Sequence, residues 1–285
     1  MKYENLAKNL LLIAFFILGF TPLLASAHQP RIVESGQTNV TDPEISKAYY
    51  SQLEGEPEFY SIKATAPFDL YVNILAPDIT GQKRDISAII LKDGKAIATL
   101  NGMDFKWEQF FEEFGHDNYW KGPEYKSKVE AGNYEIQVSS PKNDSKYSLA
   151  IGEIEAFDLK KSLNALRLIP QLKKDFFNES PLNFILSPFG WGLILVMYFL
   201  GFMVGFAYRI ILKKLAKNKV RRSSKNIGKS DRLLRFAIAI GLLLWAITTT
   251  WNPLLLFLSG FTLFEAIFSW CGLYAALGKA TCPLN

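Results

Sequence analysis

Cysteine is scarce in this chain of 285 residues: the two cysteines, Cys271 and Cys282, both lie near the C-terminus. A domain formed by the preceding residues therefore folds without disulfides and depends on its own apolar core. Histidine is equally scarce, with His28 and His116 alone, and no GxSxG or HExxH pattern occurs. These absences argue against hydrolytic and metal-dependent chemistry. We therefore predict a protein that is not an enzyme and that holds no metal or cofactor.

The net charge of +5 conceals a division along the chain. From His28 to Pro181 there are 24 acidic and 18 basic residues, whereas Lys213 to Arg235 contains ten Lys and Arg and one acid. Positive charge beside apolar runs stays in the cytoplasm and is attracted to anionic headgroups. We therefore predict membrane lipids, and not nucleic acid, as partners of this segment. The residues assigned to topology and lipid contact are Arg209, Lys213, Lys214, Arg221, Arg222, Arg232 and Arg235.

The N-terminus has the pattern of a secretory signal peptide over residues 1–27. The apolar run Leu10 to Phe20 is followed by the small-residue cleavage pattern Ala25-Ser26-Ala27. An uncleaved anchor is the alternative, but this run is shorter than the roughly 20 residues that a span needs. The mature chain is thus expected to begin at His28, outside the cytoplasm.

Tyr49 to Gly152, within a domain predicted over residues 28–156, shows the alternation of β structure. The pair Asp93-Gly94 suits the positive φ angles of a tight hairpin turn. Several short strands separated by turn residues predict an exported antiparallel, jelly-roll-like β-sandwich. The strands that the pattern predicts are Phe59–Ala64, Phe68–Leu75, Ile86–Leu91, Lys95–Leu100, Gly132–Ser140 and Tyr147–Ile151.

Aromatic residues crowd one segment, residues 105–125, which we interpret as a long inserted loop. Aromatic faces beside carboxylates suit sugar rings or cationic ligands. The predicted site for an extracytoplasmic saccharide or peptide comprises Trp107, Phe111, Glu112, Asp117, Tyr119 and Trp120. Three alternatives remain open: a loop that buries its own rings, a Ca²⁺ site among its acids, and an exported hydrolase that uses those acids.

Helical patterns occupy the rest of the chain. Residues 157–181 predict an amphipathic helix, bent at Pro170, that lies at the membrane surface; packing on the sandwich is the alternative. Transmembrane helices are predicted over residues 188–212, about 233–250 and about 254–277, with a basic loop at 213–230 between the first two. Gly201 and Gly205 have the GxxxG spacing that brings two helices together, either in a homodimer or within one chain.

Two motifs near the C-terminus resemble the ends of the YgaP-like transmembrane domain, a small module of bacterial inner membranes. The first is Asn226 to Arg235 (NIGKSDRLLR) and the second is Cys271 to Pro283 (CGLYAALGKATCP), in which Gly272 replaces a familiar proline. The resemblance covers residues 226–285 and implies an inner-membrane location but no defined biochemistry. It does not imply sulfur transfer, because the chain has no rhodanese-like domain.

A second resemblance concerns the sandwich. Residues Ala131 to Val138 and Tyr147 to Gly152, interpreted as a hairpin, are similar to the closing strands of bacterial prepeptidase-type jelly rolls. This resemblance implies a fold and no specific function.

Three further polar groups lie in the membrane half. Cys271 and Cys282 are either a redox-active pair or structural thiols. Glu265 lies at the middle of the predicted third span, where an ionised carboxylate is costly. Thr262 and Ser269 share its face, and no cation is expected at its depth, so we predict a neutral Glu265.

The favoured function is a membrane-anchored protein whose exported sandwich binds or senses a ligand. The alternative is a small redox or transport component that uses Cys271, Cys282 and Glu265.

Overall fold

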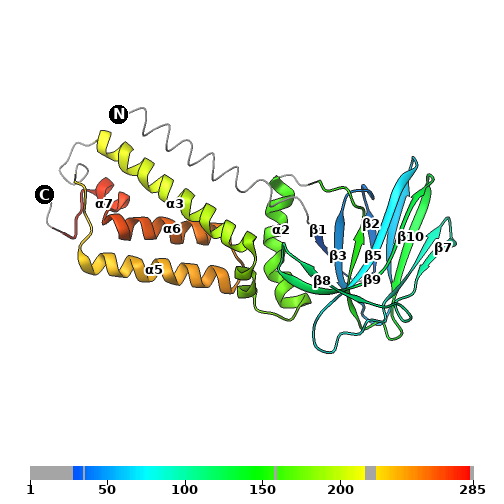
Figure 1. Ribbon diagram of the computed structural model, residues 1–285. Helices are drawn as coiled ribbons and strands as arrows, with labels where there is room; N and C mark the ends of the chain where they lie inside the picture. Colours follow the sequence, from blue (N-terminus) through cyan, green and yellow to red (C-terminus); the bar gives the residue numbers. More distant parts are fainter. Residues whose placement is uncertain (1–27, 35, 157–158, 216–222, 283–285) are drawn as a thin grey trace. The chain divides into compact units, whose positions relative to one another are not determined.

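The computed structural model describes residues 28–34, 36–156, 159–215 and 223–282. The predicted signal peptide, residues 1–27, lies outside the described residues, as do Arg221 and Arg222 of the basic loop. The chain divides into two compact units, residues 1–179 and 180–285, whose elements are labelled in Figure 1. The first unit thus extends past residue 156, the predicted end of the exported domain.

Two β-sheets form the sandwich of the first unit, as the alternation predicted. The six-stranded sheet has the order β1 (Gln29–Ile32), β3 (Lys47–Gln52), β11 (Lys146–Ile151), β5 (Phe68–Pro77), β9 (Asp117–Val129) and β8 (Glu108–Glu112). The five-stranded sheet has the order β2 (Gln37–Val40), β4 (Glu58–Ala64), β10 (Gly132–Ser139), β6 (Ser87–Lys92) and β7 (Lys95–Leu100).

The prediction of an antiparallel sandwich is wrong at two pairs of strands. β1 pairs with β3, and β2 pairs with β4, in parallel. The segment that contains β1 and β2 passes from the edge of one sheet to the edge of the other. Each of these short strands is an edge strand, with β1 beside β3 in one sheet and β2 beside β4 in the other.

The core lies between the sheets, where alternate residues of each strand are buried. Leu70, Val72 and Ile74 of β5 belong to the same buried cluster as Ile136 and Val138 of β10, and all five are fully buried. Burial of each such side chain stabilises the fold by about 1.5–3 kcal/mol relative to exposure. This core accounts for a stable domain without disulfides.

The predicted hairpin at Asp93-Gly94 is confirmed. β6 and β7 pair antiparallel across it, and both turn residues have positive φ, 47° for Asp93 and 79° for Gly94. Because both angles are positive, the turn has the geometry that matches the twist of paired strands. Aspartate and glycine tolerate these angles better than most residues do.

The predicted closing hairpin over residues 131–152 is wrong. β10 lies between β4 and β6 in one sheet, whereas β11 lies between β3 and β5 in the other. The turn at residues 140–145 therefore crosses between sheets. Alternation specifies two strands here but does not specify the sheet in which each finds its partners.

The amphipathic segment packs on the sandwich, which corrects the prediction that it lies on the membrane surface. α2 (Leu159–Gln171) continues through Pro170 and is followed by a π-helical turn, η2 (Leu172–Phe176). Leu172, Phe176 and Phe177 are buried in one cluster with Leu75, Tyr119 and Ala150 of the six-stranded sheet. These residues lie on the outer face of that sheet, so η2 forms a third layer of the unit.

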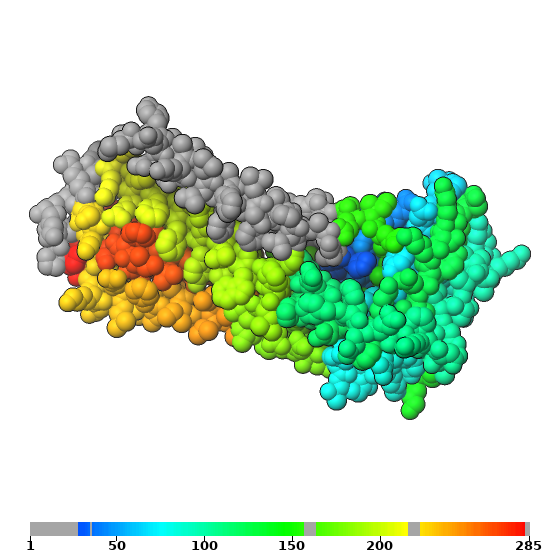
Figure 2. All heavy atoms as spheres, in the orientation of Figure 1, coloured from blue at the N-terminus to red at the C-terminus, as the bar shows by residue number. Residues whose placement is uncertain are grey.

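The second unit consists of helices that pack side by side. They are the 3₁₀ turn η3 (Pro181–Leu186), α3 (Pro188–Lys214), α5 (Lys229–Thr248), α6 (Pro253–Phe268) and α7 (Gly272–Leu277). α6 contacts both α3 and α5, and Figure 2 shows their surfaces adjoining. Among the described residues, α3 is the one helix long and apolar enough to cross a membrane by length and composition.

The predicted third span, residues 254–277, is not one helix. α6 ends at Phe268 because Ser269 adopts a left-handed conformation, with φ 52°, and α7 begins only at Gly272. The turn before α6 forms as expected: the Asn252 side chain accepts a hydrogen bond from the Leu254 N–H at 2.8 Å. α6 is thus a shorter apolar helix of 16 residues.

The GxxxG residues are used within the chain, which is one of the two alternatives stated above. A Cβ atom on Gly201 would lie 2.7 Å from the backbone nitrogen of Phe261, and one on Gly205 would lie 2.4 Å from the Phe264 ring. α6 therefore covers the face of α3 that a homodimer through Gly201 and Gly205 would require.

Candidate functional site

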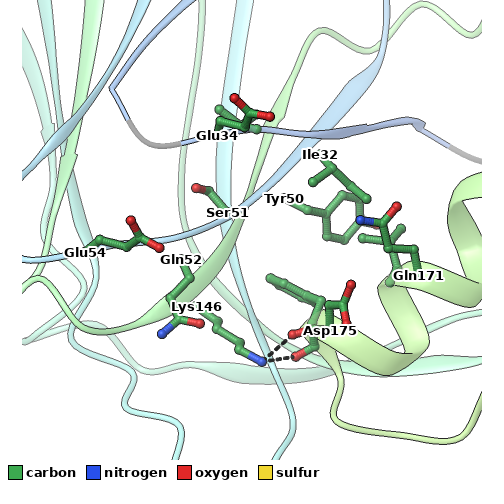
Figure 3. A pocket seen from close by; sticks show the side chains of 12 residues that line it. Ile32, Glu34, Tyr50, Ser51, Gln52, Glu54, Lys146, Gln171 and Asp175 are labelled. Atoms are coloured by element: carbon green, nitrogen blue, oxygen red, sulfur yellow. Dashed lines mark hydrogen bonds between the residues drawn. The ribbon is translucent and has the colours of Figure 1, made fainter.

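An open pocket of about 420 Å³ lies on the outer face of the six-stranded sheet, and Figure 3 shows it from close by. One wall is formed by η2 and the end of α2. The other is formed by Ile32 at the end of β1 and by Val33 and Glu34 just after it. The floor comes from β3 and β11, together with the Phe176 ring of η2. All of these elements belong to the first unit. The pocket residues used below are Glu34, Tyr50, Gln52, Glu54, Lys146, Gln171, Asp175 and Phe176.

The positions of these side chains follow from the periods of their elements. Tyr50 and Gln52 are two residues apart in β3 and project from the same face of the sheet. Gln171 and Asp175 are four residues apart in successive helical turns and project toward it. The floor is aromatic: the rings of Tyr50 and Phe176 meet edge to face with their centroids 5.0 Å apart.

The pocket is acidic. Glu34, Glu54 and Asp175 line it, and within the described part of the chain no hydrogen bond or ion pair engages their carboxylates. Two amides, Gln52 and Gln171, supply both donors and acceptors. A floor of aromatic rings below unengaged carboxylates can bind an ammonium group by charge and by contact with the ring faces.

Lys146, the one basic residue of the pocket, is already occupied. Its ammonium donates to the backbone oxygens of Asp175, at 2.6 Å, and Phe176, at 3.2 Å, and to Asn178 Oδ1 at 2.9 Å. Burial lowers its pKa. Lys146 therefore holds η2 against the sheet, and the charge of the Asp175 carboxylate opposes the effect of burial on the pKa of Lys146.

A buried carboxylate lies behind the floor. Ser51, which lines the pocket, donates to Glu58 Oε1 at 2.7 Å, and the Tyr147 hydroxyl donates to Oε2 at 2.7 Å. Burial raises the pKa of Glu58, against the opposing effect of these donors. Glu58 is 2% exposed, so it supports the floor and does not contact a ligand.

A smaller cavity of about 90 Å³ lies on the other side of Tyr50 and Leu172. Here the Tyr50 and Tyr119 hydroxyls are 3.0 Å apart, and Lys173 Nζ lies 2.5 Å from Asp117 Oδ1. Glu112 accepts hydrogen bonds from the backbone N–H groups of Phe114 and Gly115. Burial raises the pKa of both carboxyls, although Lys173 opposes this for Asp117.

The structure brings together only half of the predicted ligand site. Glu112, Asp117 and Tyr119 line the smaller cavity. Trp107 and Trp120 pack against the core between the sheets, and their indole nitrogens donate to Gly102 O and Asp78 Oδ1. Phe111 is 44% exposed and contacts the His116 ring. The predicted loop is largely a β-hairpin, β8–β9, and its alternation separates the six residues.

Sequence reasoning missed the larger pocket, because its residues come from four separate segments. The spacing of Tyr50 and Gln52, and of Gln171 and Asp175, was visible in the sequence. Nothing in that spacing indicated that β3 and η2 face each other across a cavity.

In the second unit, the two C-terminal motifs meet at one end of the helices. The Asn226 side chain donates to Cys271 O at 2.9 Å and accepts from Cys271 N at 2.7 Å. Thr281 N donates to Asn226 O at 3.0 Å, and Gly228 N donates to Thr281 Oγ1 at 2.8 Å. Asn226 is fully buried and joins the two motifs.

The expectation that Glu265 lacks a cation is wrong. Arg235 Nη1 lies 2.5 Å from Glu265 Oε2, and Arg235 Nε lies 3.2 Å from Asp231 Oδ1. Because α6 ends at Phe268, Glu265 occupies its last turn and reaches the level of Arg235 near the start of the antiparallel α5. Thr262 lies on α6 with Glu265, whereas Ser269 lies just beyond the helix in a left-handed conformation and does not continue their helical face.

The remaining predicted residues have structural contacts. Cys271 is buried, Cys282 is half-buried, and both are free thiols. Arg209 donates to Ser224 O at 2.7 Å, and the guanidinium of Arg232 lies 5.9 Å from the Phe236 ring centroid. Lys213 and Lys214 occupy the last turn of α3.

Residues 223–285 match the family described as inner membrane protein YgaP-like, transmembrane domain. This match confirms the resemblance carried by the two motifs and supports a membrane protein. No curated protein matches the chain.

Several solved structures are similar to part of the chain. The pre-peptidase C-terminal domain of collagenase from Bacillus anthracis is 8% identical, with a TM-score of 0.24, and the match covers 45% of this chain and 96% of that one. CBM35 from Cellvibrio japonicus Abf62 is 17% identical, with a TM-score of 0.24, covering 38% and 77%. The CBM36-1 domain of a multidomain xylanase from the hindgut metagenome of Trinervitermes trinervoides is 12% identical, with a TM-score of 0.19, covering 38% and 78%.

Proposed function

We propose that this protein is a membrane-anchored binding module, and that the acidic pocket binds the ammonium group of an extracytoplasmic ligand without turning it over. The observation that supports this proposal most directly is the set of three unengaged carboxylates, Glu34, Glu54 and Asp175, around an aromatic floor. Both a peptide with a free amino terminus and an amino sugar present this group.

Anchoring is assigned to the second unit. In this proposal α3, α5 and α6 all lie in the bacterial inner membrane, with the basic residues from Lys213 to Arg235 in the cytoplasm. The cluster of basic residues supports this orientation, and the family match supports the location. The sandwich is then exported behind the cleaved signal peptide, and the C-terminus is cytoplasmic.

The alternative, a redox or transport component, has less support. Arg235 pairs with Glu265, and the backbone of Cys271 is bound by Asn226. These contacts explain both residues through the packing of the helices.

Calorimetry on the detergent-solubilised full chain tests the pocket. The probes are alanine tripeptide amide, its N-acetylated form, glucosamine and N-acetylglucosamine. A probe with a free amine should bind and its acetylated form should not. Replacement of the three acids (Glu34→Gln, Glu54→Gln, Asp175→Asn) should weaken binding by roughly 1–2 kcal/mol, close to tenfold.

The matched control is Glu135→Gln, which removes a carboxylate from β10 in the other sheet and should leave binding unchanged. Equal affinity for amine and acetylated probes, or full affinity in the triple variant, would refute the assignment of the pocket. The peptide and sugar arms identify the source of the ammonium group.

A further inference from the structure

A second open cavity adjoins the acidic pocket. It has a volume of about 550 Å³, and Ile32, Val33 and Glu34 line both cavities. These three residues form the end of β1 and the chain just after it. The two cavities therefore share a rim at the edge of the six-stranded sheet.

The pleat of β1 places the cavities on opposite faces of that edge. Arg31 is in register with Tyr49, and Ile32 is in register with Tyr50. Tyr50 belongs to the outer face and lines the acidic pocket, whereas Tyr49 belongs to the face of the core and lines the second cavity. Successive residues of a strand alternate between faces, so Arg31 projects toward the second cavity.

The charge of the second cavity is opposite to that of the first. Arg31 and Lys47 line it, and Glu34 on the shared rim is its one acid. Lys47 donates to the backbone oxygens of Thr41 and Asp42, whereas within the described residues Arg31 donates one hydrogen bond, to Gln29 Oε1 at 3.3 Å. A guanidinium has five N–H donors in a planar fork that matches a carboxylate, so Arg31 retains donors for a ligand.

The remaining lining supports recognition of a polar backbone. Gln37, Thr38, Asn39 and Thr41 supply amide and hydroxyl groups along the second cavity. These groups both donate and accept hydrogen bonds, as the peptide groups of a ligand also do. An acidic cavity, a shared rim and a basic cavity thus follow one another around β1.

We propose that the ligand is a short peptide with both termini free, whose ammonium lies in the acidic pocket and whose carboxylate pairs with Arg31. This inference rests on the proposed function and adds the second end of the ligand. In this proposal Arg31 binds the carboxylate of the ligand, a role that binding of the ammonium in the acidic pocket does not require.

Calorimetry on the full chain in detergent distinguishes this inference from the proposed function. The probes are alanine tripeptide with a free carboxylate and the same tripeptide amide. We expect the free acid to bind about fivefold more tightly than the amide. Arg31→Gln should remove this difference by weakening only the free acid, and Arg31→Lys should keep part of it. Glu54→Gln with Asp175→Asn, which leaves Glu34 on the shared rim in place, should weaken both probes alike.

Circular dichroism of each variant checks that the sheet is retained, and Arg31→Lys serves as a matched variant at the same position. If the amide binds as tightly as the free acid, or if Arg31→Gln weakens both equally, the carboxylate site is refuted while the ammonium site stands. If neither peptide binds and glucosamine does, the peptide is refuted and the ammonium site again stands. If no probe with a free amine binds, both proposals fail.

Discussion

Replacement of Lys173 tests whether η2 is bound to the sandwich as the structure shows. Lys173 is 1% exposed and its ammonium donates to Asp117 Oδ1 at 2.5 Å and to His116 O at 3.2 Å. Removing one partner of a buried ion pair leaves the other charge without compensation in a poorly solvated place. Such changes cost about 3–5 kcal/mol, so Lys173→Met should lower the free energy of unfolding by about that amount.

The double variant separates the pair from general packing. In Lys173→Met with Asp117→Asn neither charge of the pair remains, so the double variant should be more stable than the sum of the two single effects predicts. We expect a coupling energy of about 2–3 kcal/mol, within the range for residues in one network. Lys174→Met, at the next and exposed position, is the matched control and should change stability by less than about 0.5 kcal/mol.

Urea unfolding of a chain of residues 28–179, followed by circular dichroism, measures these differences. At a slope of about 2 kcal/mol per molar urea, the single variant should lower the midpoint by about 1.5–2.5 M. Additive effects of the two substitutions, or a silent Lys173→Met, would show that this helical turn is not held to the sheet by this pair.

Two further substitutions have defined outcomes. Glu58→Gln should flatten the dependence of stability on pH, because burial raises the folded-state pKa of Glu58 above its unfolded value. The contribution of the protonated Glu58 to the free energy of unfolding is fully present below the unfolded pKa and is lost as pH rises through the folded pKa. Thermal melts of residues 28–179 from pH 4 to 8 measure this, and an unchanged pH profile in the variant would contradict it. In the second unit, Glu265→Gln should leave the partly buried Arg235 charge with Asp231 alone. The thermal stability of the detergent-solubilised chain should then fall, by less than the roughly 3 kcal/mol of a fully buried pair, and Arg235→Met with Glu265→Leu should recover part of the loss. A silent Glu265→Gln would instead favour the neutral carboxyl expected from the sequence.

Two errors of sequence interpretation have separate causes. Glu265 was placed at mid-span because apolar residues continue to Leu277, but Ser269 ends the helix and shifts the carboxylate to the level of Arg235. The amphipathic segment was assigned to the lipid surface because its apolar stripe has the period of a helix. A stripe of that kind requires an apolar partner and does not identify it, and here the partner is Leu75, Tyr119 and Ala150 of the sheet.

The candidate site was predicted only in part for a related reason. The density of aromatic residues from Phe105 to Tyr125 was taken as a single surface. Pairing of β9 with β5 and β8 makes the segment a strand, whose alternate side chains point to opposite faces. Trp120 therefore packs against the core while Tyr119 lies on the outer face, and Trp107, which precedes β8, also packs against the core.

The sequence by itself determined the features that depend on local pattern: the strands and their alternation, the Asp93-Gly94 turn, the long apolar α3, the division of charge, and the two motifs of the membrane domain. Only the tertiary structure decided which residues far apart in the chain meet. It placed β10 and β11 in different sheets, set η2 on the outer face, paired Arg235 with Glu265, and assembled an acidic and a basic cavity around β1. Periodicity reports the face on which a side chain lies, because that depends on neighbours in the same element. The partner across that face depends on how all the elements pack together.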